Sequence, residues 1–170
     1  VLVVDDEAIQ RQLERQILST VGFDVTEADG GAKALQLLQD NEFDVMLLDK
    51  NMPGLNGDEV CSLVRNELQM PFLPIIMVTG TTASNELVKS LNSGANDFVR
   101  KPYNPMELRA RALSAASNKR VTDQLDSTES MLFALARMVE AKDEITGDHC
   151  SRLAHSAVVF GKLLGLDDDS

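Results

Sequence analysis

Five short apolar runs, separated by amphipathic stretches, constrain the fold of this chain more than any other feature. The runs are "VLVV" (1–4), "DVTEA" (24–28), "FDVMLL" (43–48), "PIIMV" (74–78) and "DFV" (97–99). They are too short to be helices, and most lack an alternation of polar and apolar residues, which is typical of parallel strands covered by helices on both faces. The sequence therefore predicts an α/β fold with a five-stranded parallel, doubly wound sheet.

The stretches between these runs have helical periodicity. Apolar residues three or four positions apart occur in four sets: Ile9, Leu13 and Ile17; Ala34, Leu37 and Leu38; Val60, Val64 and Leu68; and Leu87 and Leu91. Gly22, Pro71 and Gly94 follow three of these sets and are residues that commonly end helices. We therefore expect a helix after each of the first four strands.

The chain changes character after residue 104. Pro105 is well placed to open a helix, and no Gly or Pro follows it until Gly147, so one long helix or two helices are expected. Residues in steps of three and four form the seam of a coiled coil, with two polar members: Asn118, Val121, Leu125, Thr128, Leu132, Leu135 and Val139. This pattern predicts a signalling helix that forms a homodimer, the alternative being a helix packed only on its own chain.

Charge and hydropathy limit the partners and the location. A formal net charge of -11 repels a nucleic-acid backbone, so we expect no nucleic-acid binding by this chain. No apolar run approaches the roughly 18 residues that span a bilayer, and the start is not a signal peptide, so we expect no membrane contact and a cytoplasmic protein. Cys61 and Cys150 have no CxxC spacing, which favours a reduced compartment. Because the chain starts abruptly in a strand without Met, a few residues are expected upstream of Val1.

Polar residues follow four of the predicted strands. Asp5 and Asp6 follow the first strand, Asp49 the third, Thr79 the fourth and Lys101 the fifth. In an open parallel sheet the carboxyl ends of the strands meet at one edge, and ligands bind there. The sequence therefore predicts that these side chains converge on one site.

Three carboxylates at one edge need a cation to offset their repulsion. Two carboxylates 4 Å apart repel by about 4 kcal/mol at an effective dielectric constant of 20. Mg²⁺ suits such a site, because it prefers one or two carboxylates together with waters and a phosphate oxygen, and Lys101 adds a compact positive charge. With these cations drawing charge from a phosphoryl group, Asp49 can act as a nucleophile and form an aspartyl phosphate.

Four motifs occur together in a recognisable order and spacing. "VLVVDDE", "LLDKNMPGLNG", "IIMVTG" and "DFVRKPYNP" resemble the receiver domain of bacterial two-component response regulators. The resemblance covers residues 1–118 and implies a flavodoxin-like receiver domain there. Residues 119–142 would then be a linker or signalling helix, the first part of a long C-terminal helical extension.

The resemblance implies a role for each residue of the predicted site. Asp49 is the phosphoacceptor, and its phosphoryl group comes from a histidine kinase or a phosphotransfer protein. The resemblance also implies a Mg²⁺ site. Its ligands would be the carboxylates of Asp5, Asp6 and Asp49 and the backbone carbonyl of Asn51. A capping role for the first two acids is the alternative.

The remaining site residues concern the response to phosphorylation. Thr79 and Lys101 are implied to contact the phosphoryl oxygens, and Pro102 to follow a cis peptide bond. Phe98 lies where receivers of this kind place an aromatic switch residue, with a core-filling role as the alternative. Phosphorylation is implied to move Thr79 toward the phosphoryl group and to turn Phe98 inward, and so to rearrange the surface of the fourth helix, the fifth strand and the fifth helix.

The C-terminal stretch "ALARMVEAKDEITGDHCSRLAHSAVVFGKLLGL" (134–166) resembles the opening helices of an HD-GYP domain, a cyclic di-GMP phosphodiesterase. Residues 143–170 would be the start of that output domain, in which His149 is a candidate ligand for an iron-like transition metal; a capping or half-exposed His149 is the alternative. His155 is expected to be a surface or packing residue. No His-Asp pair and no Gly-Tyr-Pro follow Gly147, so we expect no enzyme activity from this fragment.

The sequence thus predicts a receiver that signals through its C-terminal helix to an output domain, with a receiver that acts only as a dimerisation switch as a close variant. A metal-dependent phosphatase with an aspartyl-phosphate intermediate needs a second acid two residues after the nucleophile, where Asn51 stands. A nucleotide-binding Rossmann domain needs a Gly-rich turn after its first strand, and "VVDDEA" has none. An inactive scaffold with a coiled coil would have no reason to retain Lys101 and Thr79.

Overall fold

The computed structural model describes residues 1–80, 84–142 and 155. Strands and helices alternate along the described chain, in the order β1 (Leu2–Val4), α1 (Ala8–Ser19), β2 (Thr26–Ala28), α2 (Gly31–Asp40), β3 (Met46–Asp49), α3 (Gly57–Asn66), β4 (Ile75–Thr79), α4 (Ser84–Asn92), β5 (Asp97–Arg100) and α5 (Pro105–Lys142). The chain divides into two compact units, Val1–Thr122 and Asp123–Ser170, and α5 contributes residues to both.

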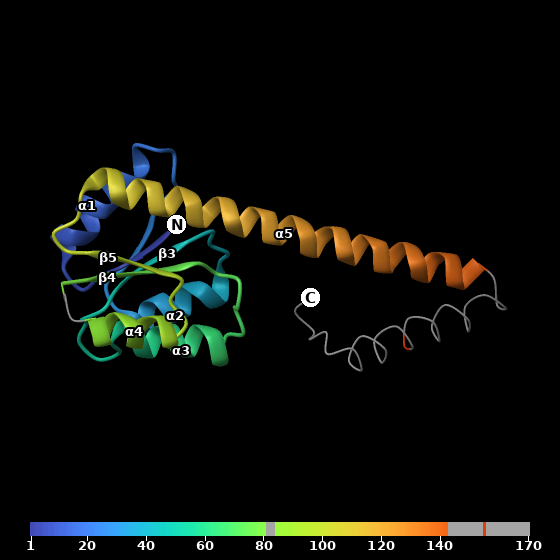
Figure 1. Ribbon diagram of the computed structural model, residues 1–170, viewed down its shortest axis with the longest axis horizontal. Coiled ribbons are helices and arrows are strands. Elements are labelled where there is room, and N and C mark those ends of the chain that lie inside the picture. Colours follow the sequence, from blue (N-terminus) through green and yellow to red (C-terminus); the bar gives the residue numbers. More distant parts are fainter. Residues whose placement is uncertain (81–83, 143–154, 156–170) are drawn as a thin grey trace. The chain divides into compact units, whose positions relative to one another are not determined.

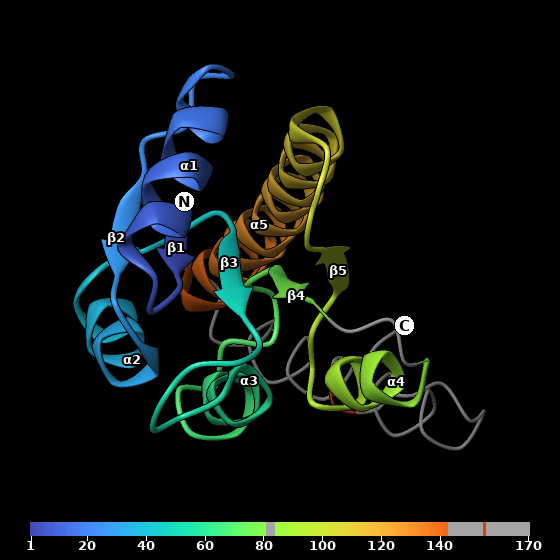
Figure 2. The ribbon, with the colours of Figure 1, turned by 90° about the vertical axis from the view of Figure 1, so that its left-hand side faces the viewer.

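The five strands form one parallel sheet in the order β2-β1-β3-β4-β5, which Figure 2 shows from one end. All four neighbouring pairs are parallel, so the carboxyl ends of the strands lie at the same edge. Val4 pairs with Leu48 and Leu48 with Met77, which brings the ends of β1, β3 and β4 level with one another. The predicted fold class, including the long C-terminal helix, is confirmed.

Alternate residues of each strand enter two separate cores. Val3, Leu47 and Val78 pack in one core with residues of α1 and of the start of α5. Val4 and Leu48 point to the other face and pack with α2 and α3. Figure 1 shows the same division, with α1 and α5 on one side of the sheet and α2, α3 and α4 on the other. Burial on both faces explains why the strands are continuous apolar runs.

Helix α1 forms where expected, but its buried face differs from the apolar set seen in the sequence. Ile17 is buried, whereas Ile9 is 80% exposed and Leu13 is 43% exposed. The buried residues of the helix are Glu14, Ile17 and Leu18. They are spaced three and four positions apart and so share one face of the helix, which means that a carboxylate takes a core position.

The predicted helix stops are also present. Gly22 follows α1 with φ +88°, and Gly94 follows α4 with φ +104°. Residues other than glycine rarely adopt such backbone conformations. Helix α3 ends at Asn66, ahead of Pro71. Among the helices of the described ranges, none is both long and apolar enough to cross a membrane.

Candidate functional site

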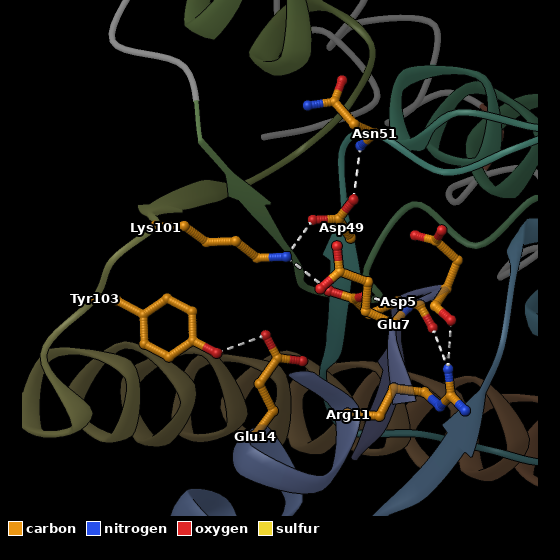
Figure 3. Close-up of polar contacts among 9 residues, drawn as sticks. Asp5, Glu7, Arg11, Glu14, Asp49, Asn51, Lys101 and Tyr103 are labelled. Carbon is orange, nitrogen blue, oxygen red and sulfur yellow. Dashed lines mark hydrogen bonds and ion pairs between the residues drawn. The ribbon is translucent and has the colours of Figure 1, made fainter. Parts of the chain in front are cut away.

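The structure brings Asp5, Asp49 and Lys101 together at the carboxyl edge of the sheet. Asp5 follows β1, Asp49 ends β3 and Lys101 follows β5. The Lys101 Nζ donates hydrogen bonds to Asp5 Oδ2 at 2.7 Å and to Asp49 Oδ1 at 2.6 Å (Figure 3). Both carboxylates are buried, with Asp5 1% and Asp49 6% exposed. One ammonium between two carboxylates leaves a net negative charge that favours a further cation.

The second oxygen of each carboxylate is held by a backbone amide. Asp49 Oδ2 accepts a hydrogen bond from the Asn51 N–H at 2.7 Å, and Asp5 Oδ1 accepts one from the Glu7 N–H at 2.8 Å. Several such partners fix the orientation of a carboxylate. The site therefore presents two oriented anionic groups, a requirement for both nucleophilic attack and binding of a hard cation.

Lys101 stays positively charged in this surrounding. Although burial alone lowers the pKa of its ammonium, the hydrogen bonds to Asp49 and Asp5 outweigh burial and raise the pKa above the ordinary value of 10.5. The side chain is therefore protonated throughout the physiological range and can attract an anion that approaches Asp49.

The loop between β3 and α3 keeps the Asp49 backbone in place. The Gly57 N–H donates to the Lys50 carbonyl at 2.9 Å and closes the loop back on the strand end. A Cβ atom on Gly57 would lie 2.7 Å from the Asp49 carbonyl oxygen, so the approach requires glycine. Asn56 caps α3, because its side chain accepts from the Glu59 N–H while the Glu59 carboxylate accepts from the Asn56 N–H.

The predicted switch residues are Thr79, at the end of β4, and Phe98, on β5. Thr79 is buried at the end of β4, and its carbonyl oxygen accepts a hydrogen bond from the Lys101 N–H at 2.8 Å. Phe98 packs, partly buried, against the core on the α2–α3 side, and the Arg100 guanidinium lies 5.6 Å from its ring centroid. Phe98 of β5 pairs with Met77 of β4, and Met77 lies two residues before Thr79 on the same strand. Thr79 and Phe98 therefore lie on the same face of the sheet. The Lys101–Pro102 peptide bond is cis.

The donor set fits Mg²⁺ better than a metal that needs a cage of protein ligands. Asp6 is exposed, and no group of three His, Cys, Asp or Glu side chains in the described ranges is close enough to hold a metal ion. Mg²⁺ needs only one or two carboxylates, because waters and phosphate oxygens complete its shell. Asp5 and Asp49 meet that requirement. The other predicted metal ligand, His149, lies outside the described residues.

Sequence reasoning missed a buried polar pair next to the site. The Tyr103 hydroxyl donates a hydrogen bond to Glu14 Oε1 at 3.0 Å, and Glu14 is 1% exposed (Figure 3). Burial raises the pKa of the Glu14 carboxyl to about 7, while the bond from Tyr103 lowers it and the charge of Asp5 raises it. The spacing of Glu14 with Ile17 and Leu18 is the signal in the sequence that could have placed it in the core.

Sequence reasoning also missed Lys50, a buried lysine that directly follows the predicted phosphoacceptor Asp49. Lys50 is buried, and its Nζ lies 3.1 Å from the Ser90 hydroxyl of α4 and 3.7 Å from Asp58 Oδ2 of α3. The other Asp58 oxygen, Oδ1, is buried without a hydrogen-bond partner among the described residues. Lys50 therefore links the loop after Asp49 to two helices.

Fold and site together define the class of this protein. It is a doubly wound parallel domain that has two carboxylates and a lysine at the carboxyl edge of its sheet. The family model of the response regulator receiver domain matches residues 1–113. The chain therefore belongs to the response regulator receiver domain family, and it is the receiver part of a two-component response regulator.

Individual relatives agree with this membership. The chemotaxis protein CheY of Pseudomonas aeruginosa is 33% identical over 112 residues, which cover 65% of this chain and 90% of CheY. The DNA-binding response regulator MtrA of Mycobacterium tuberculosis is 38% identical over 111 residues, 65% of this chain and 47% of MtrA. The chain thus spans about half the length of the MtrA proteins it matches.

Solved structures give the same result. The crystal structure of a putative response regulator from Chloroflexus aurantiacus has a TM-score of 0.65 and 31% identity, over 68% of this chain and 95% of that one. The chemotaxis protein CheY4 of Vibrio cholerae has a TM-score of 0.62 and 35% identity, over 68% of this chain and 95% of CheY4.

Proposed function

We propose that this chain accepts a phosphoryl group on Asp49 from a histidine kinase or a phosphotransfer protein, in a Mg²⁺-dependent reaction. The observation that supports this most directly is the pair of hydrogen bonds from Lys101 to Asp5 and Asp49. These two bonds bring together residues from the ends of three strands: Asp49 as the nucleophile, Asp5 as an acid of the metal site, and Lys101 as a cation that can bind a phosphoryl oxygen.

In the proposed reaction an oxygen of the Asp49 carboxylate attacks phosphorus, while the phosphorus–nitrogen bond of the phosphohistidine donor breaks. The electron pair of that bond stays on the imidazole, and an acyl phosphate forms on Asp49. Lys101 then exchanges its bond to Asp49 for one to a phosphoryl oxygen. Asp5, Asp6, Asp49 and the Asn51 carbonyl would hold Mg²⁺, which would supply positive charge that offsets the charge of the phosphoryl group.

The signal is proposed to leave the site through Thr79 and Phe98. Thr79 ends β4, and its carbonyl oxygen accepts a hydrogen bond from the Lys101 N–H. Phe98 lies on the same face of the sheet as Thr79. A shift of Thr79 toward the phosphoryl group would open space for the Phe98 ring and alter the α4–β5–α5 surface. Shifting such an equilibrium from 1:99 to 99:1 takes about 5.5 kcal/mol, within the range of a few charge-assisted hydrogen bonds.

Helix α5 is proposed to pass the change to an output domain of the parent protein and to hold two copies together. The resemblance of residues 134–166 favours an HD-GYP phosphodiesterase, whose site would be incomplete here, so this fragment itself is proposed to be inactive as an enzyme. A DNA-binding output domain is the second candidate, because MtrA is described as DNA-binding. The expectation of no nucleic-acid contact, based on net charge, is therefore not supported for the parent protein. A cytoplasmic location remains part of the proposal.

The test is phosphorylation by a small donor. Wild-type protein incubated with Mg²⁺ and acetyl phosphate should gain an acid-labile adduct of about 80 Da, located by mass spectrometry on Asp49. Asp49→Asn should gain none, and chelation of Mg²⁺ by EDTA should abolish the adduct in wild type. Asp44→Asn, just ahead of the same strand, is the matched control and should react normally. An adduct that persists in Asp49→Asn would refute the assignment.

A phosphatase is distinguished by turnover. With p-nitrophenyl phosphate as a general phosphomonoester, the proposed receiver should release no more product than Asp49→Asn. Sustained release by wild type alone would favour the phosphatase, in which another group takes the general-acid role that Asn51 cannot fill.

A further inference from the structure

The buried pair of Glu14 and Tyr103 has no part in the phosphorylation scheme above, yet it lies beside the site. Glu14 comes from α1 and Tyr103 from the connection between β5 and α5, and Figure 3 shows the pair next to Lys101. Their hydrogen bond, 3.0 Å long, joins two segments far apart in the sequence. A buried carboxylate is costly in a core, so a position that retains one invites a functional explanation.

The bond fixes the short segment that carries Lys101. Strand β5 ends at Arg100 and α5 begins at Pro105, so residues 101–104 make the whole connection. At one end the Lys101 N–H is bonded to the Thr79 carbonyl at 2.8 Å, and two residues later the Tyr103 hydroxyl is bonded to Glu14. The Lys101 backbone is thereby anchored on both sides, to β4 and to α1.

The same pair senses the charge of the site. The ionisable groups that act on Glu14 are Tyr103 from the β5–α5 connection, Asp5 from the end of β1, Asp49 from β3 and Lys101 after β5. Burial, above all, places the pKa of Glu14 at about 7; the two aspartates raise it and Lys101 lowers it. A phosphoryl group on Asp49 adds negative charge to the site, which disfavours an ionised Glu14 in the same way as the charge of Asp49 itself does.

From this geometry, and resting on the proposed phosphorylation of Asp49, we infer that Glu14 is a positioning residue. Through Tyr103 it holds the Lys101 segment, and its gain or loss of a proton sets how readily Asp49 accepts a phosphoryl group near neutral pH. Below neutrality a neutral Glu14 still accepts the bond from Tyr103 without opposing the incoming charge. Above neutrality an ionised Glu14 opposes it, and by linkage phosphorylation of Asp49 causes Glu14 to take up a proton.

The test compares the rate of adduct formation on Asp49 between pH 6 and 8.5 in wild type, Glu14→Gln and Tyr103→Phe, with acetyl phosphate and saturating Mg²⁺. Glu14→Gln mimics the neutral acid at every pH. The ratio of its rate to the wild-type rate should therefore rise about three- to tenfold between pH 6 and 8.5. Tyr103→Phe loses the anchor and should be slower at all pH values. Glu42→Gln, an exposed change away from the site, should follow wild type. Equal pH profiles for wild type and Glu14→Gln would overturn the inference.

A second measurement does not depend on phosphorylation. In ¹H–¹⁵N NMR spectra without donor or metal, the Lys101 backbone amide of wild type should shift with pH through a transition near neutrality that is absent from Glu14→Gln and weaker in Tyr103→Phe. A Lys101 amide that titrates alike in all three proteins would overturn the positioning role. If the amide behaves as expected but no adduct forms on wild-type Asp49, the proposed function fails while the link from Glu14 to Lys101 stands.

Discussion

At the scale of single residues, Glu14 carries a free-energy cost that depends on pH. Burial raises the pKa of its carboxyl from 4.5 to about 7, so the folded state binds the proton more tightly than the unfolded state. The stabilisation from this proton is fully present below pH 4.5 and is lost as the pH rises through about 7. Between these values wild type loses about 3 kcal/mol relative to a protein with a neutral residue at this position.

Glu14→Gln should therefore match wild type at pH 4.5 and exceed it in free energy of unfolding by up to about 3 kcal/mol at pH 8. Urea unfolding followed by tyrosine fluorescence measures this, since Tyr103 is the single tyrosine of a chain without tryptophan. Glu42→Gln should show no pH-dependent difference. A Glu14→Gln protein whose advantage is the same at both pH values would show that the carboxyl is not protonated on folding.

Gly57 sets a second limit at the residue scale. A methyl group there would lie 2.7 Å from both the Asp49 carbonyl oxygen and Met77 Sδ. Because the backbone oxygen cannot move aside without moving Asp49, Gly57→Ala should lower the free energy of unfolding by about 1 to 3 kcal/mol and slow adduct formation on Asp49. Gly30→Ala is the matched control, because a Cβ at Gly30 would have no neighbour within 4 Å. Denaturant titration and the mass-spectrometric assay provide the two measurements, and equal behaviour of the two variants would contradict the steric argument.

At the scale of elements, periodicity was sufficient wherever burial alone decides a residue's place. The five apolar runs became the five strands, and the residues expected to end α1 and α4 adopt left-handed conformations at Gly22 and Gly94. Periodicity failed where a polar group is buried with a partner from another element. Glu14 was overlooked because its partner Tyr103 is distant in sequence, and the apolar Ile9 and Leu13 suggested a different face for α1.

The link between α3 and α4 depends on such a group. Lys50→Met removes the bond to Ser90 and leaves the buried Asp58 with less compensating charge, so it should lower the free energy of unfolding by about 2 kcal/mol and speed hydrogen exchange in residues 88–92. Lys89→Met is the matched control. Its ammonium lies 3.9 Å from the same Asp58 oxygen but is largely exposed, so its loss should cost less than about 1 kcal/mol. Equal losses in the two variants would show that the buried position of Lys50 adds nothing.

At the scale of the whole molecule, the candidate site was predictable because parallel topology decides which strand ends meet. Asp5, Asp49 and Lys101 come from distant segments, yet each follows or ends a strand of the same sheet, and the structure joins them within hydrogen-bond distance. What the topology could not predict is the distribution of their bonds. The ammonium of Lys101 bridges two of the acids, whereas Asp6 is exposed, and these details depend on side-chain geometry at the edge.

The described part of α5 leads to a prediction about assembly. Val121, Leu125, Leu132 and Leu135 follow a heptad spacing, and each is more than half exposed. Apolar residues at that spacing are buried when two such helices pair, so we expect a homodimer through this seam.

Leu125→Asp combined with Leu132→Asp should raise the dimer dissociation constant at least about 100-fold, since four leucine side chains per dimer are lost from the contact. Sedimentation velocity over a range of concentrations measures it, with Ser130→Asp, off the seam on the same helix, as the control that should still dimerise. Wild-type protein that sediments as a monomer throughout, or leucine variants that dimerise as wild type does, would place the signalling role of α5 within a single chain.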